Sequence, residues 1–463
     1  MIERLPSGND RLDEILNGGL LKNSINLIVG VPGSGKTILS QQFAFNNASA
    51  EHPALYLSTL SEPLDKILRF GETLKVFDRE AVKQGRVIYE DLGQLLGNEG
   101  LENILATVER FLKELRPGMV VIDSFRAFHA VSSDATAFRR FLYGLTRLLS
   151  ASATTAVWNA PYTREQAREE AEFAVADGII ALDIKQIGSR EVRVLQVLKL
   201  RGSSYRSGEH SYRITDDGFD VFPRLADPQD RAPYTMVPER SSTGIDALDK
   251  ILGERGYWSG SATMVAGPSG IGKTLMGLHF LFRGAESGEP GILATFQENE
   301  TQLARVAKSF GWSFGESGVH ILSRSVVGVL IDEWVYQLLG LIEKTGARRI
   351  VIDSLPDVMS AAGDPTRFRE WMFSLTQRLE RAGISMMMIV EVPELFQLRR
   401  ISEQGLSHLA DNVVLLQYVQ EGPELARALT VLKTRAMHHH PVVHRYEITE
   451  KGFVLGDVLS LTR

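Results

Sequence analysis

Short apolar runs alternate with longer amphipathic stretches along both halves of the chain. The runs at 25–29, 54–58, 119–122 and 154–158 are predominantly apolar, as strands buried on both faces of a parallel sheet are. Between two such runs, the stretch 137–149 places apolar side chains on one helical face: Phe138, Phe141, Leu142, Leu145 and Leu149. This alternation predicts an α/β fold, in which helices flank a mostly parallel sheet on both sides.

Each half ends in a different pattern. The runs 192–200 and 428–433 are followed by 212–222 and 446–455, which favour antiparallel pairing. We therefore expect terminal β-hairpins that extend each sheet.

The two halves repeat each other. ERLPSGNDRLDEIL from Glu3 matches ERSSTGIDALDKIL from Glu239, and STLSE with TFQEN, VVIDS with IVIDS and VLKLRG with VLKTRA follow in the same order. The shift between partners stays between 230 and 237 residues, which indicates a duplicated domain and not a short solenoid repeat. We predict a first domain at 1–226, an extended linker at 227–238 and a second domain at 239–463.

Each half carries a glycine-rich loop with the spacing G-x-x-x-x-G-K-[ST], GVPGSGKT in the first and GPSGIGKT in the second. Glycines let backbone N–H groups approach phosphate oxygens, and the lysine reaches the β and γ phosphates at the positive end of the following helix. Each loop follows a predicted strand and precedes a predicted helix, which is the context of a nucleotide-binding P-loop. The predicted binding residues are Gly30, Gly33, Ser34, Gly35, Lys36 and Thr37, and Gly267, Ser269, Gly270, Ile271, Gly272, Lys273 and Thr274.

A P-loop also needs ligands for Mg²⁺. Thr37 and Thr274 offer hydroxyls, and Asp123 and Asp353 end hydrophobic strands at the edge where ligands of open α/β sheets gather. The alternative for each aspartate is that it caps the next helix.

Hydrolysis needs a group that orients or deprotonates water. Pairing Thr59 with Thr295 aligns Glu62 with Glu298, each just after the strand that follows the P-loop helix. We predict that these glutamates activate water, the alternative being that they are solvated loop residues.

Composition and charge mainly exclude certain classes of protein and certain kinds of site. The 463-residue chain has a formal net charge of -6, which argues against nucleic-acid binding through a broadly basic surface. It has no cysteine, so disulfides, thiolate metal sites and cysteine nucleophiles are excluded. The start of the chain does not read as a signal peptide, and the longest apolar runs fall well short of the roughly 20 residues of a membrane span. We expect a cytoplasmic protein.

The duplicated architecture, the two loops and the segment VLKLRGSS resemble the KaiC family of bacterial circadian-clock ATPases, within the RecA-type superfamily. The resemblance covers nearly all of both halves. It implies two tandem RecA-like P-loop domains, ATP and Mg²⁺ as cofactors, and a homo-hexameric ring with nucleotide at the subunit interfaces. Two adjacent glutamates activate water in that family; here Ser61 and Gln297 replace the first of each pair, and Glu62 and Glu298 remain.

The resemblance also implies a Lys-x-Arg pair that reaches the nucleotide of the neighbouring subunit. Lys199 with Arg201, and Lys433 with Arg435, match it. Residues two apart on a strand face the same side, so one edge presents both cations. The alternative is a pair of exposed strand charges.

In the family, the second domain phosphorylates itself on adjacent Ser and Thr residues. Ser407 and His408 stand at those positions, whereas the first half has Phe173 and Ala174. Ser407 is thus a candidate phosphosite in a Ser autokinase, with an ordinary helix serine as the alternative. A small regulatory protein on the first domain is a further expectation from the family. The family's long C-terminal tail has no counterpart after the final hairpin, so activation through it is not expected.

Weaker signals leave other functions open. Arg399 and Arg400 suit a loop that touches single-stranded nucleic acid, but without interleaved aromatic residues they favour a solvated loop. His438, His439, His440 and His444 favour a polar hairpin tip over a metal site. The alternatives to the ring ATPase are a DNA-binding recombinase or helicase motor and an ATP-dependent scaffold with little hydrolysis.

Overall fold

A computed structural model places most of the chain in two compact units, Met1–Arg224 and Leu225–Arg463. The described residues are 3–59, 64–98, 100–163, 166, 170–187, 190–225, 239–253, 255–325, 327–392, 409–421, 423–435 and 441–459. The predicted linker at 227–238 lies outside them and stays a prediction.

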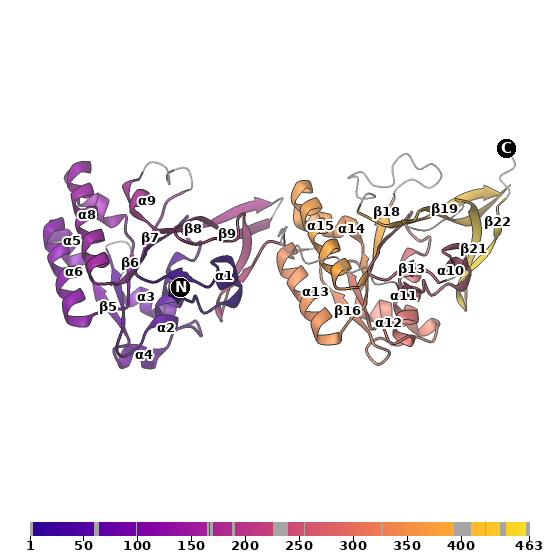
Figure 1. Cartoon of the computed structure of the whole chain (residues 1–463), viewed down its shortest axis with the longest axis horizontal. Helices are drawn as coiled ribbons and strands as arrows, with labels where there is room; N and C mark the ends of the chain where they lie inside the picture. The colour runs from indigo at the N-terminus through magenta and orange to yellow at the C-terminus, as the bar shows by residue number, and fades with distance from the viewer. Residues whose placement is uncertain are drawn as a thin grey trace. The chain divides into compact units, whose positions relative to one another are not determined.

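Unit one is a nine-stranded sheet in the order β11-β10-β9-β8-β3-β7-β6-β4-β5 (Figure 1). Its strands, with the small pair β1 and β2, are β1 Arg4–Leu5, β2 Leu20–Leu21, β3 Ile25–Gly30, β4 Ala54–Ser58, β5 Val87–Asp91, β6 Met119–Asp123, β7 Thr155–Ala160, β8 Gly178–Ile187, β9 Arg190–Leu200, β10 His210–Thr215 and β11 Gly218–Phe222. Its helices are α1 Asp10–Ile15, α2 Lys36–Asn47, α3 Leu64–Gly71, α4 Arg79–Lys83, α5 Gly93–Asn98, α6 Leu101–Leu115, α7 Ala127–Ala130, α8 Ala135–Ala151 and α9 Ala171–Val175.

Unit two repeats this order as β22-β21-β20-β19-β14-β18-β17-β15-β16. Its strands are β12 Arg240–Ser241, β13 Tyr257–Trp258, β14 Ala262–Gly267, β15 Gly291–Thr295, β16 Val319–Ser323, β17 Arg349–Asp353, β18 Ser385–Glu391, β19 Asn412–Glu421, β20 Glu424–Lys433, β21 Val443–Thr449 and β22 Gly452–Val458. Its helices are α10 Asp246–Ile251, α11 Lys273–Glu286, α12 Glu300–Ser309, α13 Ile331–Thr345, α14 Leu355–Ala362 and α15 Pro365–Arg381.

The predicted α/β fold is confirmed in both units. In unit one β3 to β8 run parallel to one another, and β9, β10 and β11 continue the sheet as antiparallel strands, as the terminal hairpins predicted. The helix expected at 137–149 is α8, and all five residues of its predicted apolar face are buried. Asp134 starts α8 because its carboxylate accepts hydrogen bonds from the N–H groups of Thr136 and Ala137.

Each sheet buries an apolar core on both of its faces. In unit one, α6 and α8 pack on one face around Phe128 and Phe141, and α2 packs on the other around Phe43 and Tyr212. The apolar faces of these helices are buried in these cores. Among the described residues, we find no helix whose length and apolar character would suit it to crossing a membrane.

One buried histidine of unit two connects α11 to the terminal hairpin. His279 Nε2 accepts a hydrogen bond from the backbone N–H of Phe453 at 3.0 Å. In unit one, the side-chain oxygen of Gln42 accepts the matching bond from Phe219 at 3.0 Å. Burial lowers the pKa of His279 to about 4, and its hydrogen bond with Gly244 opposes that shift.

We expect His279→Gln to remove an acid sensitivity of unit two. Below pH 6.5 the unfolded chain protonates this histidine while the folded chain does not, so stability falls as pH falls from about 6.5 to about 4. The total loss is about 3 kcal/mol. Urea unfolding at several pH values, followed by the fluorescence of the adjacent Trp312, measures it. Equal pH slopes in the two proteins would contradict the assignment.

Candidate functional site

The P-loop of unit one joins the end of β3 at Gly30 to the start of α2 at Lys36. Gly33 and Gly35 have φ values of 79° and 90°, the left-handed region in which other residues are strained. The Lys36 ammonium donates to the carbonyl oxygens of Gly30 and Val31 at 2.9 and 3.0 Å. The predicted loop, helix start and lysine therefore form one local unit.

Unit two builds the same loop between β14 and α11. Gly270 and Gly272 have φ values of 74° and 107°, and the Lys273 ammonium donates to the Pro268 carbonyl at 2.7 Å. Burial lowers the pKa of Lys273, as it does that of Lys36, while nearby carboxylates act in the opposite direction.

The two predicted metal ligands of each unit meet in space. Thr37 Oγ1 donates to Asp123 Oδ2 at 2.7 Å, and Thr274 Oγ1 donates to Asp353 Oδ2 at 2.6 Å. They come together because only one strand, β7 in unit one and β18 in unit two, separates the strand that ends at each aspartate from the strand that enters the loop. A hydroxyl and a carboxylate are hard oxygen donors of the kind Mg²⁺ prefers, so this pair fits that ion.

A buried tyrosine distinguishes the two predicted metal sites. Tyr56, in β4, donates its hydroxyl to the same Asp123 oxygen at 2.7 Å. Strand register places Leu293 of β15 at the matching position of unit two. A tyrosine inside an apolar run reads as core, so the sequence did not single it out.

A pair of tyrosines, one in each unit, fixes the P-loops from the terminal hairpins. Tyr212 donates to the Ser34 carbonyl at 2.6 Å, and Tyr446 donates to the Ile271 carbonyl at 2.6 Å. Both hydroxyls are buried, and both rings stack on a phenylalanine of the adjoining strand. These bonds span 178 and 175 residues and were also missed in the sequence.

The loop of unit one opens into a cavity of about 420 Å³. Lys36 and Thr37 line one side, and Ile67 and Phe70 of α3 line another. A site with convergent polar groups and an apolar wall is typical of ligand pockets.

Glu298 lies beside Asp353 of unit two, three residues after β15 ends. Burial raises its pKa, and the charge of Asp353 raises it further. Gln297, which precedes it, is exposed and donates to Asp357 at 2.9 Å. Glu298 is therefore a half-buried carboxyl group at the same edge of the sheet as the P-loop. Its increased proton affinity suits a general base.

The pairing of Thr59 with Thr295 is wrong by one residue. In the sheets, Ser58 lies opposite Asp123 and Thr295 lies opposite Asp353, so Ser58 and Thr295 are equivalent. Counting onward along the sequence matches Ser61 with Glu298 and Glu62 with Asn299. Short polar segments align equally well in two registers, and only the strand pairing separates them. Residues 60–63, including Glu62, lie outside the described part.

The Lys-x-Arg pairs lie at the sheet edge opposite their own P-loops. Lys199 pairs with Ile179 of β8, three residues before Leu182, the partner of Gly30. Three residues correspond to about 10 Å along a strand. Lys199 donates to the Phe173 carbonyl at 3.3 Å, and Arg201 pairs with Asp177 at 3.3 Å.

Unit two repeats the arrangement. Lys433 lies opposite Val413, the partner of Met264, three residues before Gly267. Its ammonium donates to the Ala410 carbonyl at 2.6 Å, and Arg435 pairs with Asp411 at 3.1 Å.

Several predicted features lie outside the described residues: Ser407, Arg399, Arg400, His438, His439 and His440. His210, which matches His444 in register, is buried and accepts a hydrogen bond from the backbone N–H of Arg224 at 2.9 Å. Its other ring nitrogen lies 3.1 Å from the Arg206 carbonyl. These bonds give His210 a structural role.

Comparison of the sequence with known proteins matches it to one family. The family described as "ATPase: KaiC" matches residues 5–226 and 241–458. The chain is 28% identical to the circadian clock oscillator protein KaiC of a Picosynechococcus strain, across 98% of this chain and 90% of that protein. It is 27% identical to the KaiC of Thermostichus vulcanus, across 98% and 89%, and 26% identical to KaiC 1 of a Synechocystis strain, across 97% and 88%.

Proposed function

Since the chain belongs to the KaiC family of ATPases over both of its domains, we propose that each P-loop binds ATP and that the sites operate in a homo-hexameric ring. The observation that carries the proposal is the same lysine, threonine and aspartate geometry in both units. Its relatives are named circadian clock oscillator proteins, and we propose an ATP-driven regulatory or timing role for this chain.

Each residue of the loop has a distinct role in this proposal. Lys36 and Lys273 bind the β and γ phosphates, and the glycines present backbone N–H groups to them. Thr37 with Asp123, and Thr274 with Asp353, would hold Mg²⁺, which would supply positive charge to neutralise the phosphates. Tyr212 and Tyr446 act as positioning residues, because each hydroxyl fixes a carbonyl within the loop.

Glu298 takes a proton from the attacking water in unit two. The oxygen of that water forms a bond to the γ phosphorus, the bond to the β–γ bridging oxygen breaks, and ADP and phosphate leave. Its position beside Asp353 and its raised pKa support this role.

We expect Glu298→Gln to retain ATP and lower hydrolysis in unit two by roughly 10² to 10⁴-fold, because the amide orients water but does not accept its proton. Phosphate release in Lys36→Ala chains, whose first site is silent, measures the effect. Unchanged turnover would show that another group is the base.

Glu62→Gln in Lys273→Ala chains is the matched variant for unit one. We propose Glu62 as the water-activating residue of that unit, although the corrected register aligns it with Asn299 and not with Glu298. We therefore expect a smaller loss than in unit two. A loss as large as that of Glu298→Gln would show that Glu62 activates water as effectively as Glu298, despite the shift of one residue between their positions.

The Lys-x-Arg positions support a ring. Each lysine lies about 10 Å along the strand from its own P-loop, and each arginine lies further toward the opposite edge of the sheet. A cation at that edge is suited to the nucleotide of a neighbouring copy. We propose that Lys199 with Arg201, and Lys433 with Arg435, stabilise the γ phosphate across subunit interfaces.

We also propose that unit two phosphorylates Ser407. The Ser407 oxygen attacks the γ phosphorus of ATP bound in the neighbouring subunit, the bond to the β–γ bridging oxygen breaks, and ADP leaves. The serine proton passes to Glu298 of that neighbour. Unit one has Phe173 at this register, buried against Tyr162, so it offers no acceptor there.

We expect Ser407 to carry phosphate after incubation with γ-labelled ATP, as measured by peptide mass spectrometry. The label should be absent from Ser407→Ala and Lys273→Ala and present in Lys36→Ala, since the donor is the second site. No incorporation would leave an ATPase without kinase activity. Label elsewhere in unit two would keep the kinase and reject this acceptor.

A further inference from the structure

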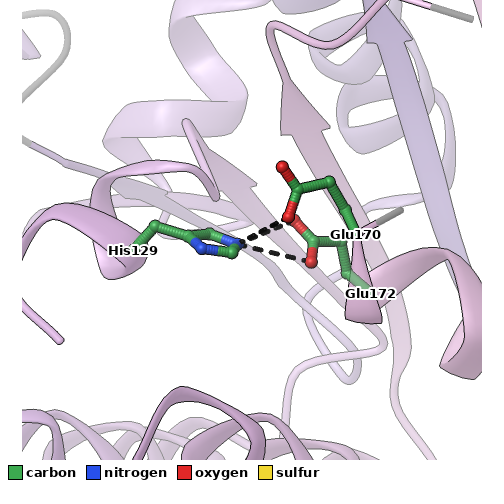
Figure 2. Close-up of side chains that lie close together, drawn as sticks. All are labelled: His129, Glu170 and Glu172. Carbon is green, nitrogen blue, oxygen red and sulfur yellow. Dashed lines mark hydrogen bonds and ion pairs between the residues drawn. The ribbon is translucent and has the colours of Figure 1, made fainter. Parts of the chain in front are cut away.

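Three side chains of unit one that are not part of the P-loop converge: His129 of α7, Glu170 at the start of α9 and Glu172 within α9. Figure 2 shows the imidazole directed at both carboxylates. His129 Nε2 lies 3.2 Å from Glu172 Oε1 and 3.9 Å from Glu170 Oε2. One nitrogen or oxygen from each of the three lies within 4.8 Å of the others.

The donor set and its spacing suit one ion. Imidazole nitrogen and carboxylate oxygen bind Zn²⁺ at about 2.0 to 2.2 Å, so ligand atoms around a tetrahedral ion lie about 3.3 to 3.6 Å apart. The distances of 3.2 and 3.9 Å bracket that spacing. Three protein ligands leave a fourth position for water.

Surrounding groups hold two of the ligands in place. Glu172 is fully buried, and Tyr162 donates its hydroxyl to Oε1 of this carboxylate at 2.5 Å. The His129 ring stacks on Phe138 with 3.7 Å between the ring centroids. Partners of this kind orient metal ligands and fix their basicity.

The remaining faces of the cluster are open to solvent. The side chains of His129 and Glu170 are each 31% exposed, so an ion can enter from that side.

Among the described residues, this cluster is found in unit one alone. The alignment of the two units that matches Asp123 with Asp353 and Phe138 with Phe368 makes Met359 the equivalent of His129.

We propose that His129, Glu170 and Glu172 form a binding site for a single Zn²⁺ ion in the first domain. The ion connects α7, which follows β6, to α9, which precedes β8. Lys199 donates to the Phe173 and Ala174 carbonyls of α9, so the ion also steadies the helix on which Lys199 rests. The proposal does not depend on ATP binding.

Zinc binding to the full chain tests the site, in competition with a chromophoric chelator. The background carries alanine at His438, His439 and His440, which removes the histidine run of unit two. We expect one ion per chain. His129→Met, which installs the residue of unit two, and Glu170→Gln should each abolish this site, and Tyr162→Phe should weaken it by about 10- to 100-fold.

Co²⁺ provides an independent readout, because visible absorption reports a nitrogen and oxygen environment that changes in His129→Met. Glu170 is half-exposed, so Glu170→Gln tests the site without disturbing the core. ATP binding by each variant serves as the check on folding. Absence of zinc binding, or equal binding by the parent, His129→Met and Glu170→Gln, would overturn the proposal.

Discussion

Lys36→Ala and Lys273→Ala are each expected to abolish ATP binding in their own unit and to leave the other site occupied. Both ammonium groups lie over their loops, where they donate to loop carbonyls at 2.7 to 3.0 Å. In the complex they move to the β and γ phosphates, and alanine offers no charge there.

Equilibrium binding of a fluorescent ATP analogue gives the number of sites per chain. We expect two in the parent, one in each variant and none in the double variant. Lys113→Ala is the control, because that lysine is exposed on α6 and pairs with Glu109. Two occupied sites in either P-loop variant would refute the assignment of that loop.

The second large effect concerns the cations that we place across the subunit interface. We expect Lys199→Ala with Arg201→Ala to lower ATP hydrolysis in the first domain by about 10³ to 10⁵-fold, the usual worth of a trans-acting cation at the γ phosphate. The measurement uses Glu298→Gln chains, in which the second site is nearly silent.

Subunit mixing separates a trans role from a local one. A Lys36→Ala chain keeps the cations but has no working loop, and the Lys199→Ala, Arg201→Ala chain keeps the loop but lacks the cations. If the cations act on a neighbour, mixed assemblies regain activity that neither chain has alone. No recovery in mixtures whose ring assembly is verified by light scattering would contradict the trans role.

A different strand register for Lys199 would have predicted another result of the mixing experiment. Had Lys199 lain level with Leu182, beside the end of β3, it would serve its own loop and mixing would change nothing. The register places it level with Leu27 instead. Arg201 lies further in the same direction, since its backbone N–H donates to the Asp177 carbonyl.

Local patterns determined much of this protein from its sequence. The P-loops could be predicted because their glycines, lysine and threonine are consecutive and their function follows from local backbone conformation. The location of Asp123 and Asp353 beside the P-loops could be predicted because both residues end apolar strands, and parallel strands bring their carboxyl ends to one edge of the sheet. The structure confirms that Thr37 meets Asp123 and that Thr274 meets Asp353.

What the sequence did not reveal depends on pairing between distant strands and helices. Residue types alone do not show that the Tyr56 hydroxyl donates to Asp123, because a tyrosine in an apolar run looks like a core residue. They also do not show whether Ser61 or Glu62 is the counterpart of Glu298. Strand register decides both, because a shift of one residue reverses which face each side chain occupies. His129 and Glu172 are 43 residues apart, and only the packing of α7 against α9 brings them together.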